Sequence, residues 1–158
     1  MRIALDLYPC DLLFVHRDSE GESYQARVDE IRNAVGTAKG RGVVPPAICV
    51  VPIRMMEAWF LFDEGALRRA AGNPHGRMVL ELPRIGKIEA IPDPKSLLHG
   101  LLRDASGLRG QRRKKLPVDA CVHRIAELCR SFAPLRELTA FHSLERELAN
   151  VLSQQGWR

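Results

Sequence analysis

Two short apolar runs, separated by one amphipathic helical pattern, constrain this chain more than any other feature of its sequence. The first run covers residues 11–16 and ends at a histidine, and the second covers residues 47–53. Both runs are rich in apolar β-branched or aromatic residues, which predicts buried strands. Between them, residues 23–39 repeat apolar side chains at helical spacing. This order predicts one βαβ unit with parallel strands and a right-handed crossover.

The second half of the sequence predicts mostly helices. These are expected over residues 54–62 and 63–71, from near Ser96, from Asp119, and over residues 142–153. A short edge strand is predicted at residues 78–82, followed by an extended stretch over 83–94. The fold class is therefore a small α/β protein, with a parallel sheet flanked by helices and a helical C-terminal half. The length of 158 residues fits a single domain, residues 1–158.

The first nine residues predict the last turns of a helix that ends at Pro9. A small α/β domain rarely begins with half a helix, so we expect the sheet to lack an N-terminal strand. No apolar run approaches the ~20 residues that span a bilayer, and no secretory signal precedes the first strand. We therefore expect a cytoplasmic protein with no membrane partner.

The cysteines and the net charge limit the kinds of site and partner that are expected for this chain. The four cysteines form no C-x-x-C pair and have no histidine cluster beside them, which predicts free thiols in a reducing compartment and no zinc site. The sequence also lacks the common phosphate-loop, dinucleotide, serine-hydrolase and zinc-protease signatures. A formal net charge of +5 permits contact with nucleic acid or another polyanion but does not require it.

Three carboxylates are predicted near the carboxyl ends of the two strands. Asp18 and Glu20 follow the first strand, and Glu57 lies just beyond the second. Because neighbouring parallel strands end side by side, these acids can face one crevice, where open α/β sheets bind ligands. Mg²⁺ takes one or two carboxylates together with water and phosphate oxygens, so Mg²⁺ or Mn²⁺ is the expected cofactor. The alternative is an acidic turn and an acid near a helix dipole, with no metal.

Cations occur beside these acids and again farther along the chain. Arg17 and Arg54 adjoin the acids, where they can hold phosphate or form surface ion pairs, and His16 can assist proton transfer or play a structural role. A second group, named here the basic run, consists of Arg109, Arg112, Arg113, Lys114 and Lys115. Such a run contacts a nucleic-acid backbone in some proteins and is a solvated loop in others.

Several blocks of the chain, taken in order, resemble a known family. They are V-H-R-D-S-E-G at residues 15–21, V-P-I-R-M-M-E-A-W-F-L-F-D at residues 51–63, D-P-K at residues 93–95, and L-R at residues 135–136 leading to Phe141. Together they resemble the bacterial Toprim-like proteins of the domain-of-unknown-function family 4276. That family is similar to RloB-like proteins and to the Toprim half of the OLD nucleases. The resemblance covers about residues 7–152.

The resemblance implies a Toprim-type acidic site that binds divalent metal. In such domains a glutamate after an N-terminal strand joins a D-x-D pair after a later strand. Here Asp18 matches the first acid of the pair, Glu20 stands at the second, and Glu57 matches the glutamate of the E-A-W block. The N-terminal glutamate has no counterpart before residue 11. Members are often encoded near ABC-type ATPases in phage-defence regions, which implies an ABC- or OLD-type ATPase as partner.

Two functions follow as hypotheses. The first is a Mg²⁺-dependent nuclease-type protein that hydrolyses phosphodiesters. Asp18 and Glu57 are then the catalytic residues, and both bind metal together with Glu20. The second is a non-catalytic module that binds nucleic acid or an ATPase and retains a degenerate site. The missing acid favours the second hypothesis, and the three acids at the strand ends favour the first.

Overall fold

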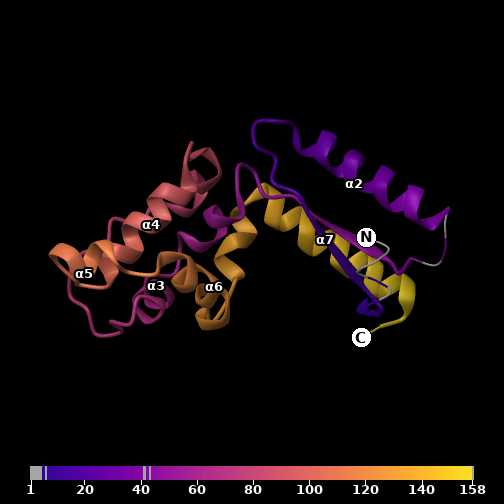
Figure 1. Ribbon diagram of the computed structural model, residues 1–158. Helices are drawn as coiled ribbons and strands as arrows, with labels where there is room; N and C mark the ends of the chain where they lie inside the picture. The colour runs from indigo at the N-terminus through magenta and orange to yellow at the C-terminus, as the bar shows by residue number, and fades with distance from the viewer. Residues whose placement is uncertain (1–4, 6, 41, 43, 158) are drawn as a thin grey trace. The chain divides into compact units, whose positions relative to one another are not determined.

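The computed structural model describes residues 5, 7–40, 42 and 44–157 (Figure 1). These residues form two compact units: unit 1 comprises the described residues within 1–53 and 139–158, and unit 2 comprises residues 54–138. The helix end predicted at the start of the chain falls partly on residues 1–4 and 6, which lie outside the described residues.

Unit 1 contains a two-stranded parallel sheet. Strand β1 (Leu13–His16) pairs with strand β2 (Ala47–Val50), so that the first residues of the two strands face each other and so do the last. The parallel sheet and the α/β class are therefore confirmed, although both strands are shorter than predicted. Proline flanks β2 at both ends and lacks an N–H, yet Pro46 and Pro52 still accept ladder bonds through their carbonyls.

Helix α2 (Tyr24–Lys39) connects the two strands and covers one face of the sheet. It begins where predicted, because the Ser23 hydroxyl accepts a hydrogen bond from the N–H of Ala26, which satisfies one of the unpaired donors of the first turn. Its buried stripe has helical spacing and packs on β2 and the residue that follows it. The cluster consists of Val28, Ile31, Val35, Cys49 and Val51.

Helix α7 (Thr139–Gln155) completes unit 1 and packs against β2. It begins three residues before the predicted start and ends two residues after the predicted end. The contact with β2 includes a hydrogen bond from the backbone N–H of Cys49 to the Glu147 carboxylate, at 3.1 Å. The sheet is therefore held by α2 on one face and by α7 alongside β2.

Unit 2 is built from helices only, as far as it is described, and α3 to α6 gather in one cluster (Figure 1). In chain order its elements are the 3₁₀ turn η1 (Met56–Phe60), α3 (Glu64–Ala70), the 3₁₀ turn η2 (Ile85–Ala90), α4 (Pro94–Ala105), α5 (Gly110–Lys114), α6 (Val118–Leu128) and the 3₁₀ turn η3 (Ala133–Glu137). Asp63 and Asp93 cap α3 and α4 through their carboxylates. The fully buried centre includes Leu67, Leu98, Leu102 and Ile125.

Three predictions for unit 2 are wrong in detail. Residues 54–62 contain a 3₁₀ turn in place of an α-helix, because the N–H groups of Ala58 and Leu61 bond three residues back. Residues 78–82 are not a strand: Val79 is 83% exposed, and the N–H of Leu82 bonds to Leu80 in a tight local turn. The stretch predicted as extended contains η2. No helix in the described part of the chain is long and apolar enough to cross a membrane.

Candidate functional site

The carboxyl end of β1 forms a tight, internally bonded turn. His16 Nε2 lies 3.0 Å from Asp18 Oδ1, and the Asp18 side chain is 20% exposed. Ser19 is buried: its N–H donates to the carbonyl of Pro52, and its carbonyl accepts bonds from the Glu22 N–H and from Arg27 Nε. The turn is thus anchored to the end of β2, and this holds Asp18 at the sheet end where the sequence predicted it.

The next two residues reverse the chain. Glu20 has φ of 50° and Gly21 has φ of 96°, so both occupy the left-handed region that a non-glycine residue rarely adopts. Glu20 is exposed, and Asp18 and Glu20 both follow β1 directly as predicted. Among the described residues, no group of three or more His, Cys, Asp or Glu side chains is arranged to hold a metal ion.

The cations beside this turn belong to an ion-pair network with α2. Arg27 Nη1 lies 2.7 Å from Glu30 Oε2, and Arg17 Nε lies 3.6 Å from Glu30 Oε1. Hydrogen bonding to Arg27, helped by the charge of Arg17, holds the pKa of Glu30 below its usual range. The Arg17 side chain remains 45% exposed. Arg17 therefore forms a surface ion pair, the alternative to phosphate binding, and Glu30 is its partner.

Glu57 and Arg54 lie in unit 2, apart in the chain from the acids of unit 1. Glu57 occupies the first turn of η1, beside the buried Ala58 and Trp59. Arg54 is exposed, with φ of 72°. Since these two residues belong to one unit and Asp18 belongs to the other, a shared site for the three predicted acids stays a prediction.

The basic run of unit 2 is presented to solvent. Helix α5 buries none of its residues, and its cations lie in the last turn, where they interact favourably with the helix dipole. Arg113 Nη2 lies 2.5 Å from Asp104 Oδ1, so this cation is engaged within the unit. The other four cations of the run are exposed: Arg109, Arg112, Lys114 and Lys115.

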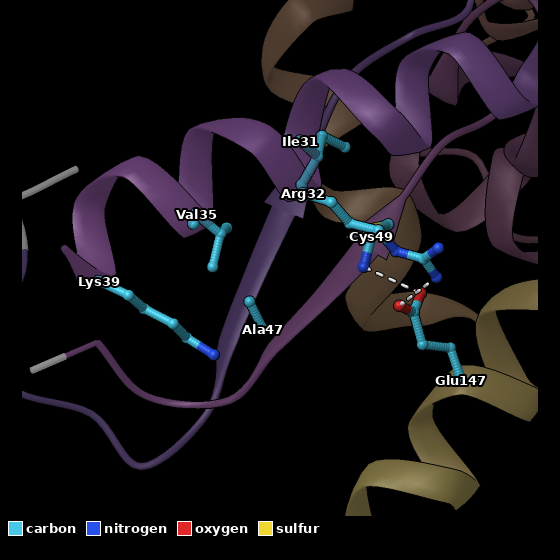
Figure 2. A pocket seen from close by; sticks show the side chains of 8 residues that line it. Ile31, Arg32, Val35, Lys39, Ala47, Cys49 and Glu147 are labelled. Atoms are coloured by element: carbon cyan, nitrogen blue, oxygen red, sulfur yellow. Dashed lines mark hydrogen bonds and ion pairs between the residues drawn. The ribbon is translucent and has the colours of Figure 1, made fainter.

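A pocket of about 220 Å³ lies between α2, β2 and α7 in unit 1 (Figure 2). Figure 2 shows Glu147 pointing from α7 toward the backbone of Cys49 and the side chain of Arg32. The Arg32 Nη2 to Glu147 Oε1 distance is 3.7 Å. Burial first, and then the negative charge of Glu147, raise the pKa of the Cys49 thiol to about 11. The thiol is thus largely protonated, and its thiolate fraction is small at neutral pH.

Sequence reasoning missed Glu147 and Arg32. Glu147 stands between Leu144 and Val151 at helical spacing, so it borders the apolar stripe of α7. An acid at such a position was the available signal, because it needs a partner when it approaches the core. All four cysteines are free thiols, as predicted, and Cys10 is the exposed one.

Comparison with known proteins found no match for this chain. No family model matches the chain, and neither a curated protein nor a solved structure does. Two surfaces of the chain carry candidate functional residues: the turn after β1 in unit 1, and α5 with its neighbours in unit 2.

Proposed function

We propose that the chain is a nucleic-acid-binding protein that contacts the phosphate backbone through α5 and its flanking residues. The observation that carries this proposal is the exposure of four cations of the basic run, two on α5, which buries none of its residues, and two at the positions that flank it. Each cation placed near a phosphate releases condensed counterions, so such a surface binds nucleic acid in a salt-dependent way. The net charge of +5 has the sign that favours this association.

Neutralising the exposed cations should weaken binding to a duplex. We expect replacement of Arg109, Arg112, Lys114 and Lys115 by glutamine to lower the affinity at least tenfold at ~0.1 M salt, with the slope of log K against log salt reduced by up to about 3.6. Fluorescence anisotropy with a labelled duplex, titrated at several salt concentrations, measures both quantities. Arg113 is left unchanged because its guanidinium already pairs with Asp104.

A matched control separates the surface from the net charge. The control replaces four other exposed cations of unit 2 by glutamine and so removes the same number of positive charges: Arg77, Arg84, Lys87 and Lys95. This variant should lose much less affinity than the α5 variant. Equal losses of affinity in both variants would show that net charge alone accounts for the binding. Unchanged affinity in the α5 variant would show that α5 does not contact the nucleic acid.

A second candidate function is Mg²⁺- or Mn²⁺-dependent hydrolysis of phosphodiesters, in the manner of a Toprim-like nuclease. The placement of Asp18 at the end of the parallel strands, 3.0 Å from His16, favours it. Asp18 and Glu20 supply the one or two carboxylates that Mg²⁺ uses alongside water and phosphate, with Glu57 as the proposed third acid. When bound, the metal would stabilise the charge that develops in phosphoryl transfer. A phage-defence role beside an ABC- or OLD-type ATPase belongs to this same proposal.

Metal binding at the β1 turn is tested by thermal melting. Mg²⁺ or Mn²⁺ should raise the melting temperature of the wild-type protein, because a ligand that binds only the folded state stabilises it. Asp18→Asn keeps the shape of the side chain and should abolish the rise, whereas Glu22→Gln, an exposed acid of the same turn, should leave it intact. If neither metal raises the melting temperature of the wild-type protein, the proposed metal site is contradicted.

The catalytic role is tested separately from the metal site. The wild-type protein should nick supercoiled plasmid in the presence of Mg²⁺ or Mn²⁺, and Glu57→Gln should lose this nicking. Intact metal stabilisation without nicking would leave a binding module and contradict the enzyme.

A further inference from the structure

The pocket between α2, β2 and α7 in unit 1 is mostly apolar in its middle and charged at its ends (Figure 2). Its volume is about 220 Å³. The apolar lining consists of the buried Ile31, Val35 and Cys49 together with Ala47. An apolar protein cavity of about 150 Å³ binds benzene. The pocket therefore has room for an apolar group the size of a phenyl ring with a small polar group attached.

Gly36 lines the same pocket from the interior of α2. A glycine weakens the interior of a helix relative to alanine. Close packing does not account for it, because a Cβ atom on Gly36 would meet none of the described atoms within 4 Å beyond its own stretch of helix. Its φ is not positive either, so the backbone does not demand glycine. The missing side chain thus leaves one wall of the pocket open.

Two cations and one carboxylate border the pocket: Arg32, Lys39 and Glu147. The Glu147 carboxylate is already engaged, because it accepts the N–H of Cys49 at 3.1 Å and lies 3.7 Å from the Arg32 guanidinium. Lys39 is exposed, and in the described part of the chain no carboxylate forms an ion pair with it. Figure 2 shows its side chain reaching from the last turn of α2 toward β2 near Ala47. The uncompensated charge at the pocket is therefore positive.

We propose that this pocket binds a small organic carboxylate whose apolar body is about the size of a phenyl ring. The apolar body would lie against Ile31, Val35 and Ala47, with the carboxylate at the Lys39 amino group. Such a division of labour is typical of ligand pockets, where apolar side chains supply the contact area and a few polar groups fix the orientation. A charged acceptor is favoured over a neutral one, because charge-assisted hydrogen bonds are the stronger kind.

The test is binding of small carboxylates to the intact chain, followed by amide NMR shifts. Benzoate and 3-methylbutanoate are the probes, and benzamide is the neutral control with the shape of benzoate. At least one carboxylate should shift the amide signals of Ala47 and Cys49 saturably, with a dissociation constant of about 1 mM. Benzamide should bind at least about tenfold more weakly than benzoate. No saturable shift with either carboxylate up to about 20 mM, or equal affinity for benzamide, would overturn the proposal.

Two variants locate the ligand within the pocket. Lys39→Met keeps the stem of the side chain and should reduce the affinity for benzoate to that for benzamide. Lys95→Met, at an exposed lysine of unit 2, should leave it unchanged. Gly36→Leu places a side chain at the open wall and should weaken benzoate binding at least about tenfold, with an unchanged circular dichroism spectrum because leucine favours a helix.

Benzoate binding that persists unchanged in Lys39→Met or in Gly36→Leu would place the ligand elsewhere and overturn the proposal. The variants of the pocket leave the cations of α5 in place, so these outcomes are independent of the nucleic-acid binding proposed above.

Discussion

Replacing Arg68 by alanine should lower the free energy of unfolding by roughly 3 kcal/mol, because several hydrogen bonds and a packed side chain are lost together. Arg68 is buried on α3, with 7% of its surface exposed. Its Nε and Nη2 atoms lie 2.8 and 2.6 Å from Glu64 Oε1, and Nη2 also donates to the carbonyl of Met78. The side chain therefore joins α3 to the segment that the sequence predicted to be a strand.

The same arginine supports the loop that precedes this segment. The N–H of Asn73 donates to the Arg68 carbonyl, and the N–H of Gly76 donates to the Asn73 carbonyl. A Cβ atom on Gly76 would lie 2.5 Å from Asn73 Nδ2 and 2.8 Å from Arg68 Nη1, so a larger residue there would displace these two side chains. We expect hydrogen exchange at residues 73–80 to accelerate in Arg68→Ala before the rest of unit 2 is affected.

Two control variants separate the contributions of Arg68. Arg68→Met keeps an unbranched side chain that fills the space, so it should cost clearly less than alanine while still freeing the loop. Glu64→Gln weakens the ion pair at a side chain that is 48% exposed and should cost less than about 1 kcal/mol. Urea denaturation measures all three variants. Wild-type stability in Arg68→Ala would show that the buried guanidinium contributes no net stability.

Replacing Glu147 by alanine should cost roughly 2 kcal/mol, because the buried N–H of Cys49 loses its acceptor. Cys49 is only 3% exposed, so this N–H loses a charged acceptor at a largely buried position. Glu147→Gln retains an oxygen that accepts the same bond and should cost much less. Equal destabilisation in both variants would assign the effect to the charge of Glu147, not to the hydrogen bond.

Thiol chemistry gives a second measure of the same contact. Burial and then the charge of Glu147 raise the pKa of Cys49, so removing the charge lowers that pKa and increases the thiolate fraction. Alkylation of Cys49 by iodoacetamide at about pH 8 should therefore be faster in Glu147→Ala. Burial raises the pKa of Cys121 as well, but Glu147 does not contribute there, so its alkylation should be unchanged.

The pH dependence of stability follows from the same thiol. The Cys49 thiol ionises near pH 9 when unfolded and near pH 11 in the folded protein, so the unfolded state loses its proton first. Stability therefore falls as pH rises from 9 to 11, by at most about 1.4 kcal/mol per pH unit for this group. Cys49→Ala should flatten this part of the stability profile, measured by urea denaturation at several pH values.

Local sequence patterns predicted the structure correctly wherever interactions between residues close in the chain determine it. The stripe of Val28, Ile31 and Val35 predicted α2, and the N-caps Ser23 and Asp93 lie close to the predicted helix starts, because each acts within one or two helical turns. The patterns gave a wrong prediction where a strand requires a partner strand to pair with. Residues 78–82 have strand-like composition, but no partner strand lies beside them in the part of unit 2 that is described.

The sequence alone therefore determined the βαβ unit and the position of Asp18 beyond β1, since both depend on side-chain periodicity within about forty residues. The tertiary structure decided the rest. Glu147 reaches the N–H of Cys49 across 98 positions of the chain, and Arg68 reaches the carbonyl of Met78 across a loop. The pairing of buried donors with acceptors depends on how the helices and strands pack. The spacing of residues along the sequence does not predict that packing.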